Sequence, residues 1–192
     1  METEWEATFW PVQKDDARKR LADAGAVRVY PERLMRRVNL YPPIDSGDAE
    51  IFARVRDEGD RVTMTVKDMS GTKIEEQKEA EVVVENFEKA RAVLRALGCR
   101  DKNYQETHRE LWRLEETEIT IDEWPFLEPF VEIEGSSEDE VRTVAEKLGF
   151  PWSEARFCSA DVLYAERYGV EAQFVNRGIP ILTFDIESPF KK

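Results

Sequence analysis

Polar and apolar residues alternate along most of the chain, which is the period-two pattern of β-strands with one solvated face. Two pairs of such stretches, 50–57 with 61–68 and 103–115 with 117–124, flank short acidic turns, so we expect two β-hairpins. Further strands are predicted over 2–10, 27–41, 73–84 and 129–134. About eight main strands, mostly in hairpins, favour an antiparallel sheet that curls or closes.

Helical spacing of apolar residues, with recognisable end signals, interrupts this pattern. Helices are predicted over 13–24, 87–97, 137–148 and 160–168. Asn86 is a typical N-cap, and Ser137 with Glu140 matches a capping box. Short extended pieces are expected in the tail over 173–186. The fold class is therefore α+β, and because no break in composition marks a boundary, we expect one domain over 1–192.

Composition excludes several classes of protein. The 192 residues include 41 acidic and 28 basic side chains, for a net charge of −13, which disfavours binding to nucleic acid or to an anionic membrane. A hydrophobic content of 41% is too high for a disordered chain. No apolar run is long enough to span a membrane, the acidic start is unlike a signal peptide, and only two cysteines occur. We therefore expect a cytoplasmic protein.

Charged residues of one sign share a face within several predicted strands. Examples are Glu4 with Glu6, Arg54 with Arg56, and Glu132 with Glu134. Such like-charged neighbours repel each other unless an opposite charge or a ligand lies between them. One interpretation is an ordinary solvated sheet face. The other is a closed sheet whose inner face binds a polyanion together with divalent cations, because carboxylates hold Mg²⁺ or Mn²⁺ while arginine and lysine bind phosphate oxygens.

Six short motifs follow one another in an order typical of one family. They are Glu4-Trp5-Glu6-Ala7-Thr8, Ala53-Arg54-Val55-Arg56, Val62-Thr63-Met64-Thr65-Val66-Lys67, Glu79-Ala80-Glu81, His108-Arg109-Glu110-Leu111-Trp112, and Ile119-Thr120-Ile121-Asp122-Glu123 followed by Phe130-Val131-Glu132-Ile133-Glu134-Gly135. This set resembles the CYTH superfamily of triphosphate tunnel metalloenzymes, and most closely its class IV adenylate cyclase-like branch. The superfamily also contains thiamine triphosphatases and inorganic triphosphatases.

The resemblance implies a closed eight-stranded antiparallel β-barrel with flanking helices, in which a tunnel holds the triphosphate. It implies Mg²⁺ or Mn²⁺ as cofactor, bound by carboxylates of Glu4, Glu6, Asp122, Glu132 and Glu134. It further implies that phosphates are bound by Arg54, Arg56, Lys67, Lys78, Arg109 and Arg113. Glu6 and Arg109 are the residues expected to act in catalysis.

One position departs from the family pattern, because Thr8 stands where the signature has lysine. A hydroxyl group cannot supply the positive charge of that lysine. Three hypotheses follow. In the first, the chain is an enzyme that either converts ATP to cyclic AMP and pyrophosphate or hydrolyses the terminal phosphate of tripolyphosphate or thiamine triphosphate. In the second, it is a non-catalytic triphosphate-binding module. In the third, it is a structural domain with solvated strands. We expect a monomer or a homodimer.

Overall fold

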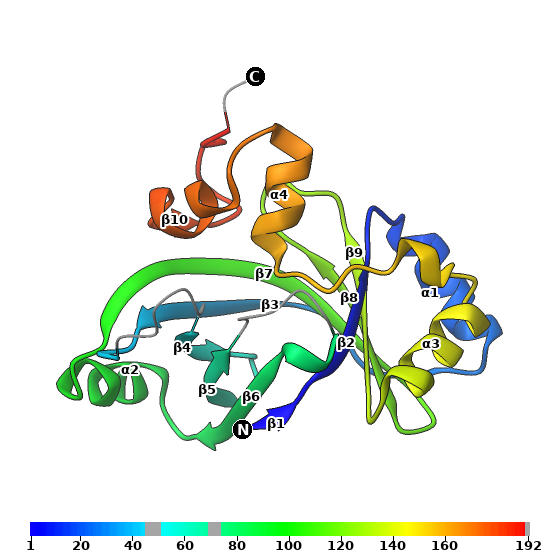
Figure 1. Ribbon diagram of the computed structural model, residues 1–192, viewed down its shortest axis with the longest axis horizontal. Coiled ribbons are helices and arrows are strands. Elements are labelled where there is room, and N and C mark those ends of the chain that lie inside the picture. Colours follow the sequence, from blue (N-terminus) through cyan, green and yellow to red (C-terminus); the bar gives the residue numbers. More distant parts are fainter. Residues whose placement is uncertain (45–50, 69–73, 191–192) are drawn as a thin grey trace.

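The alternating stretches of the sequence form one strongly curled sheet in the computed structural model, which describes residues 1–44, 51–68 and 74–190. The strands are β1 (Glu2–Thr3), β2 (Trp5–Phe9), β3 (Val27–Tyr41), β4 (Ile51–Asp57), β5 (Val62–Asp68), β6 (Lys78–Val84), β7 (Arg100–Leu114), β8 (Thr117–Glu123), β9 (Phe130–Gly135) and β10 (Ile181–Leu182). The order across the sheet is β1-β6-β5-β4-β3-β7-β8-β9-β2, and each of these neighbouring pairs is antiparallel. The fold is α+β, with the sheet curled into a half-barrel (Figure 1).

The N-terminal segment contacts both ends of this strand order. β1 pairs with β6, β2 pairs with β9, and between them the Glu4 backbone N–H donates to the Gln77 carbonyl at 3.0 Å. The single strand expected over 2–10 is therefore divided where it changes partner. Together with β10, which lies parallel to β7, this division gives the described residues ten strands in a half-barrel, where a closed barrel of eight was expected.

The four predicted helices are present, with small differences at their ends. They are α1 (Lys14–Asp23), α2 (Phe87–Ala96), α3 (Glu138–Lys147) and α4 (Ala160–Tyr168). Both predicted N-caps are confirmed: Asn86 Oδ1 accepts from the Lys89 N–H at 2.9 Å, and Ser137 Oγ accepts from the Glu140 N–H at 3.3 Å. The Glu140 carboxylate binds the Ser136 N–H at 2.9 Å, so the capping box closes one residue earlier than the pattern predicts.

Two other stretches differ from the expectation. Within 73–84, a 3-10 turn η1 (Ile74–Glu76) precedes β6. The sequence also predicts a turn at Ser70 and Gly71 and a loop over 45–48, and both lie outside the described residues. The tail forms a π-helical turn η3 (Phe174–Gly178) and the short strand β10. In chain order, these elements come after a 3-10 turn η2 (Trp152–Glu154) and α4. The apolar residues of the tail pack together with those of α4 in a separate cluster, which alternation in the sequence does not predict.

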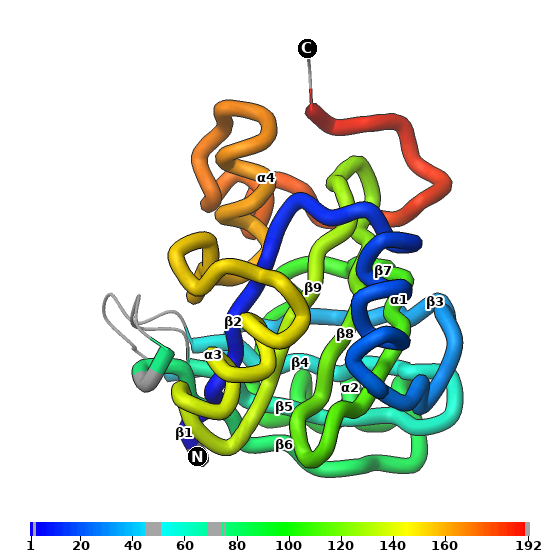
Figure 2. The backbone as a smooth tube through the Cα atoms, turned by 90° about the vertical axis from the view of Figure 1, so that its right-hand side faces the viewer, coloured from blue at the N-terminus to red at the C-terminus, as the bar shows by residue number. Residues whose placement is uncertain are grey.

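Apolar side chains on the outer face of the sheet pack against helices. Helices α1 and α3 cover β2, β8 and β9 on one side, while α2 covers β3 and β4 (Figures 1 and 2). A third apolar cluster joins α4, η3 and β10 to the loop after β8. Among the described residues, none of the helices combines the length and the apolar character needed to cross a bilayer. Because the outer face takes up the apolar residues, the polar residues of the same strands point inward.

Candidate functional site

The inner face of the sheet lines a cavity of about 270 Å³. The predicted site residues that line it are Glu4, Glu6, Arg54, Arg56, Lys67, Arg109, Glu132 and Glu134. These residues come from the five strands β2, β4, β5, β7 and β9 and, for Glu4, from the link between β1 and β2. They are as much as 130 positions apart in the sequence, as for Glu4 and Glu134. Acidic residues outnumber basic ones in the lining, so the cavity carries opposite charges close together and an excess of carboxylates.

Strand register explains why these side chains meet. Glu6 lies directly opposite Glu134 in the β2–β9 pair, and Lys67 lies opposite Glu79 in the β5–β6 pair. Arg54 and Arg56 lie opposite Thr65 and Thr63, whose short side chains leave room above β5. Because successive residues of a strand face opposite sides, Trp5, Ala7 and Phe9 enter or contact the outer core when Glu4 and Glu6 enter the cavity.

Three carboxylates form the acidic part of the cavity. One oxygen from each of Glu4, Glu6 and Glu134 can be chosen so that all three lie within 4.8 Å of one another. Burial and then the charge of Glu132 raise the pKa of Glu6 well above its usual range. Burial and then the charge of Glu4 raise the pKa of Glu134 to about 7, although part of this side chain is open to solvent. A hard divalent cation such as Mg²⁺ or Mn²⁺ takes such oxygen ligands and would relieve this repulsion, so the residues fit the metal.

Lys67 is the cation that contacts this acidic group in the structure. Its Nζ lies 2.8 Å from Glu4 Oε2 and 3.4 Å from Glu79 Oε2. Burial lowers the pKa of Lys67, but the charges of Glu4, Glu6 and Glu79 outweigh burial and raise it overall. The lysine is therefore held charged between two carboxylates that also line the cavity.

Arg109 is fixed by two acidic residues, one on the adjacent strand β8 and one on β9, the strand beyond it. Its Nε lies 2.7 Å from Asp122 Oδ1, and one of its terminal nitrogens lies 2.6 Å from Glu132 Oε2. Asp122 is fully buried and also accepts from Thr120 Oγ1 at 2.6 Å. Asp122 therefore lies behind Arg109 and outside the cavity lining, so its observed contact is with a guanidinium group.

Two predicted phosphate-binding residues lie away from the cavity. Lys78 begins β6 opposite Thr3 with its side chain exposed. Arg113 lies near the end of β7, where its half-exposed side chain pairs with Glu118 at 2.6 Å. The structure does not bring these two side chains together with the others.

Thr8 also lies outside the lining and is only 2% exposed. It faces Glu132 across the β2–β9 pair, and its backbone exchanges two hydrogen bonds with Arg156, at 2.9 and 3.0 Å. The family's lysine position is thus covered by the segment that follows η2.

Many lining residues were not predicted from the sequence, and two groups of them show why. Arg37 lies on β3 in phase with Asn39, so alternation with the apolar Val38 and Leu40 could have identified it. Residues 158–161 and 175–176, which lead into α4 and belong to η3, also line the cavity. No local signal marks this second group, because only packing of the tail places it there.

A family model, the CYTH domain, matches residues 41–161. No curated protein matches the chain significantly.

Several solved structures are similar in fold. The PH1012 protein of Pyrococcus horikoshii OT3 has a TM-score of 0.67 at 21% identity, over 83% of this chain and 98% of its own. A candidate adenylate cyclase of Vibrio parahaemolyticus has a TM-score of 0.70 at 11% identity, over 85% and 98%. The Hippeastrum protein HpAC1, a candidate adenylyl cyclase with a dominant triphosphatase activity, has a TM-score of 0.52 at 11% identity, over 86% and 96%. At these identities the likeness shows the fold alone. The family model, in contrast, covers more than half of the sequence, and the chain therefore belongs to the CYTH domain family.

Proposed function

We propose that this protein is a metal-dependent enzyme that binds a triphosphate in the cavity and acts on it, as class IV adenylate cyclases convert ATP to cyclic AMP and pyrophosphate. The CYTH family binds triphosphate substrates and is generally metal-dependent. The observation that carries the proposal is the meeting of Glu4, Glu6 and Glu134 with Arg54 and Lys67 in one cavity.

The arrangement suits transfer at a phosphorus centre, where catalysis depends on positioning and charge neutralisation. Arg54, Arg56, Lys67 and Arg109 are proposed to bind phosphate oxygens, with Arg109 oriented by Asp122 and Glu132. Mg²⁺ or Mn²⁺ held by carboxylates of Glu4, Glu6, Glu132 and Glu134 would supply Lewis-acid neutralisation of the phosphates. Glu6 and Glu134, whose pKa values are raised in the metal-free site, must lose their protons to take that role, so metal binding would release protons.

We also propose that the half-barrel is completed as a tunnel by the N-terminal segment. Support comes from the two pairings of that segment, β1 with β6 and β2 with β9, which are the two ends of the strand order. In this arrangement the acidic side chains of the segment lie between the two ends of the sheet. Glu4 is the residue at which the segment changes partner.

A second candidate reaction is hydrolysis of the terminal phosphate of tripolyphosphate or thiamine triphosphate. It is favoured by the triphosphatase activity of the Hippeastrum protein of similar fold. Both reactions use the same binding residues, and they differ in whether a ribose hydroxyl or water attacks phosphorus.

Product analysis tests the proposal. The protein is incubated with ATP, tripolyphosphate or thiamine triphosphate and with Mg²⁺ or Mn²⁺, and the melting temperature is measured in parallel. We expect a ligand at about 100 times its Kd to add about 2.7 kcal/mol of stability, and cyclic AMP with pyrophosphate as products from ATP.

Three other outcomes have clear meanings. Release of orthophosphate favours the hydrolase. A rise in melting temperature with no turnover of any substrate favours the binding module, which is the alternative that Thr8 raises. An unchanged melting temperature with every triphosphate and metal contradicts a triphosphate site altogether. Glu6→Gln is the matched variant, since it keeps the shape of the side chain and is expected to remove metal-dependent turnover.

A further inference from the structure

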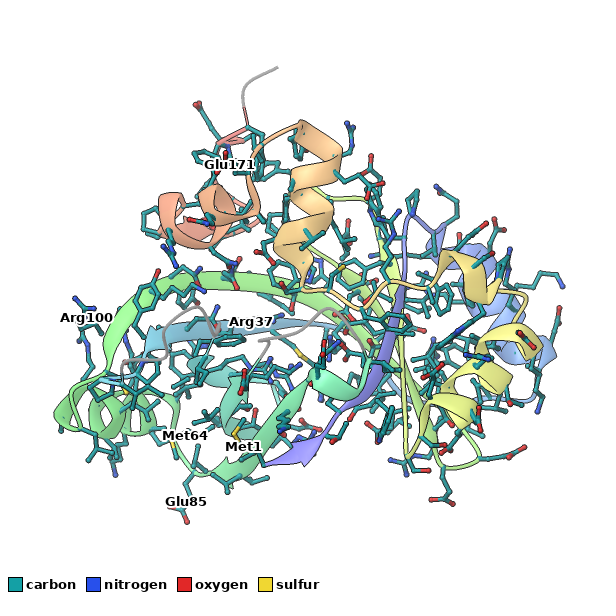
Figure 3. All side chains as sticks on the ribbon, in the orientation of Figure 1. Met1, Arg37, Met64, Glu85, Arg100 and Glu171 are labelled. Carbon is teal, nitrogen blue, oxygen red and sulfur yellow. The ribbon has the colours of Figure 1, made fainter. Side chains whose placement is uncertain are left out.

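Arg37 is a buried cation in the cavity wall that forms no ion pair with the acidic residues the structure describes. Its side chain is on β3 in the interior of the molecule (Figure 3), and the residue is only 6% exposed. Within the described part of the chain, no carboxylate oxygen lies within the 4.0 Å of an ion pair from its guanidinium group. Burying an unpaired charge is costly, so such a group is retained only where something compensates it.

The neighbours of Arg37 add to its charge. It lies directly opposite Arg56 on β4, and Arg54 is two residues further along that strand. Arg56 has Glu58 at 2.6 Å, and Arg54 has Glu79 and Glu81 each at 3.7 Å. Of these three arginines, Arg37 is the one without a carboxylate at ion-pair distance among the described residues. Burial and then the charges of Arg54, Arg56 and Arg109 hold the pKa of Arg37 well below its usual range.

The guanidinium group is nevertheless held in place. One terminal nitrogen donates to Thr107 Oγ1 at 2.9 Å, and the group lies 4.4 Å from the centre of the Trp124 ring. Its Nε is buried and has no hydrogen-bond partner in the part of the chain that the structure describes. A rigid, planar donor with unused N–H groups is suited to bind an oxyanion, because its geometry matches that of phosphate oxygens.

We propose that Arg37, with Arg54 and Arg56, forms a subsite for the terminal phosphate of the polyphosphate chain. This inference rests on the proposed triphosphate site and adds a residue that no family motif in the sequence indicated. A terminal phosphate has three free oxygens and carries more negative charge than an inner one. It is therefore the part of the substrate that three neighbouring guanidinium groups, one of them unpaired, compensate best. Arg37 also supplies a positive charge in a chain that has Thr8 at the signature lysine.

The test compares Arg37→Met with the wild type by calorimetric titration of tripolyphosphate with Mg²⁺ and by melting without ligand. We expect Arg37→Met to weaken tripolyphosphate binding about tenfold to a hundredfold, the loss typical of a hydrogen bond to a charged group. We also expect the ligand-free variant to melt at the same temperature as the wild type or higher, because an uncompensated buried charge is removed. Arg37→Lys keeps the charge without the planar donor and should bind with intermediate affinity.

A control on the same strand is Arg36→Met. Arg36 points to the opposite face, has a side chain 50% exposed, and pairs with Asp57 at 3.0 Å, so this variant should bind tripolyphosphate as the wild type does. ATP with an esterified terminal phosphate distinguishes binding of the terminal phosphate from binding of the inner ones. Arg37→Met should weaken the binding of this ester less than it weakens the binding of ATP.

Each contrary result is distinguishable. The subsite is wrong if Arg37→Met melts at a lower temperature or fails to fold, or if it binds tripolyphosphate as tightly as the wild type. In each of these cases Arg37 is a structural residue packed on Trp124, and the proposed function stands. Equal losses for ATP and its esterified form also contradict a terminal subsite. If the wild type binds no triphosphate, both the subsite and the proposed function fail.

Discussion

At the scale of single residues, the cavity depends on charges that are buried in pairs. Arg109 with Asp122 is the clearest case, because Asp122 is fully buried and its partner is only 16% exposed at the side chain. Such a pair adds little stability compared with an apolar pair of the same shape. Removing one partner, however, leaves the other charge buried without compensation, which is strongly destabilising. Pairs of this kind are therefore weak evidence for stabilisation and good evidence for a constraint on the site.

Breaking this pair is expected to be costly. We predict that Arg109→Met lowers the free energy of unfolding by about 3–5 kcal/mol, because Asp122 loses its compensating charge. Urea unfolding measures the change. Arg113→Met is the control from the same strand, and its exposed pair with Glu118 should contribute no more than about 1 kcal/mol. Similar losses in the two variants would show that the buried pair does not constrain the site.

A second prediction concerns pH. Glu134 has a pKa of about 7 in the folded protein, whereas an unperturbed glutamate has about 4.3, so between these values the folded state holds a proton that the unfolded state lacks. The contribution of Glu134 to the free energy of unfolding is therefore present at low pH and is lost as the pH rises through about 7. In metal-free buffer, Glu134→Gln should gain stability relative to the wild type between about pH 5 and pH 8. A stability difference that is constant over this range would contradict the raised pKa.

At the scale of elements, the helices pack against the outer face of the strands whose inner face carries the site. Helix α2 packs Phe87, Ala90 and Leu94 against the outer face of β3 and β4, whose inner faces carry Arg37, Arg54 and Arg56. Its first turn is capped by Asn86, outside the cavity lining. The cap should therefore influence stability without touching the ligand.

We predict that Asn86→Ala lowers the free energy of unfolding by about 1 kcal/mol, the usual cost of losing an N-cap acceptor. Asn86→Asp keeps the acceptor and places a negative charge at the helix N-terminus, so it should preserve stability. Both variants should bind tripolyphosphate with wild-type affinity. Loss of affinity in Asn86→Ala would show that α2 positions the arginine strands more directly than its packing suggests.

At the scale of the whole molecule, three apolar clusters are attached to one sheet. The cluster under α1 and α3, the cluster under α2 and the cluster around α4 use different parts of the same strand array. Strand β7 runs through the sheet from Arg100 to Leu114. One end of β7 contributes to the cluster under α2 and the other end to the cluster under α1 and α3, so both clusters are built on one continuous strand. We therefore propose that residues 1–192 are a single domain.

A single domain is expected to unfold in one step. We predict that tryptophan fluorescence and far-ultraviolet circular dichroism follow the same thermal transition, and that the calorimetric and van't Hoff enthalpies agree. Separate transitions, with the α4 cluster lost first, would instead divide the chain into two units. Addition of tripolyphosphate and Mg²⁺ should raise the single transition as a whole.

Local sequence was sufficient for much of the fold and part of the site. Alternation predicted the two hairpins, the long strand from Val27 to Tyr41 and the faces of Glu4, Glu6, Arg54 and Arg56, because side chains in a strand must alternate. Helix caps at Asn86 and Ser137 were also readable, since each cap is a contact within a few residues.

Only the tertiary structure decided which charges meet and which remain alone. Register and curvature bring Glu134 to Glu4 and Glu6, place Asp122 behind Arg109, and leave Lys78 and Arg113 outside the cavity. Packing of the tail adds residues 158–161 to the lining, and burial leaves Arg37 without a carboxylate partner among the described residues. These outcomes depend on contacts between residues far apart in the chain. The sequence determined which face each side chain takes, and the curled sheet determined what stands opposite that face.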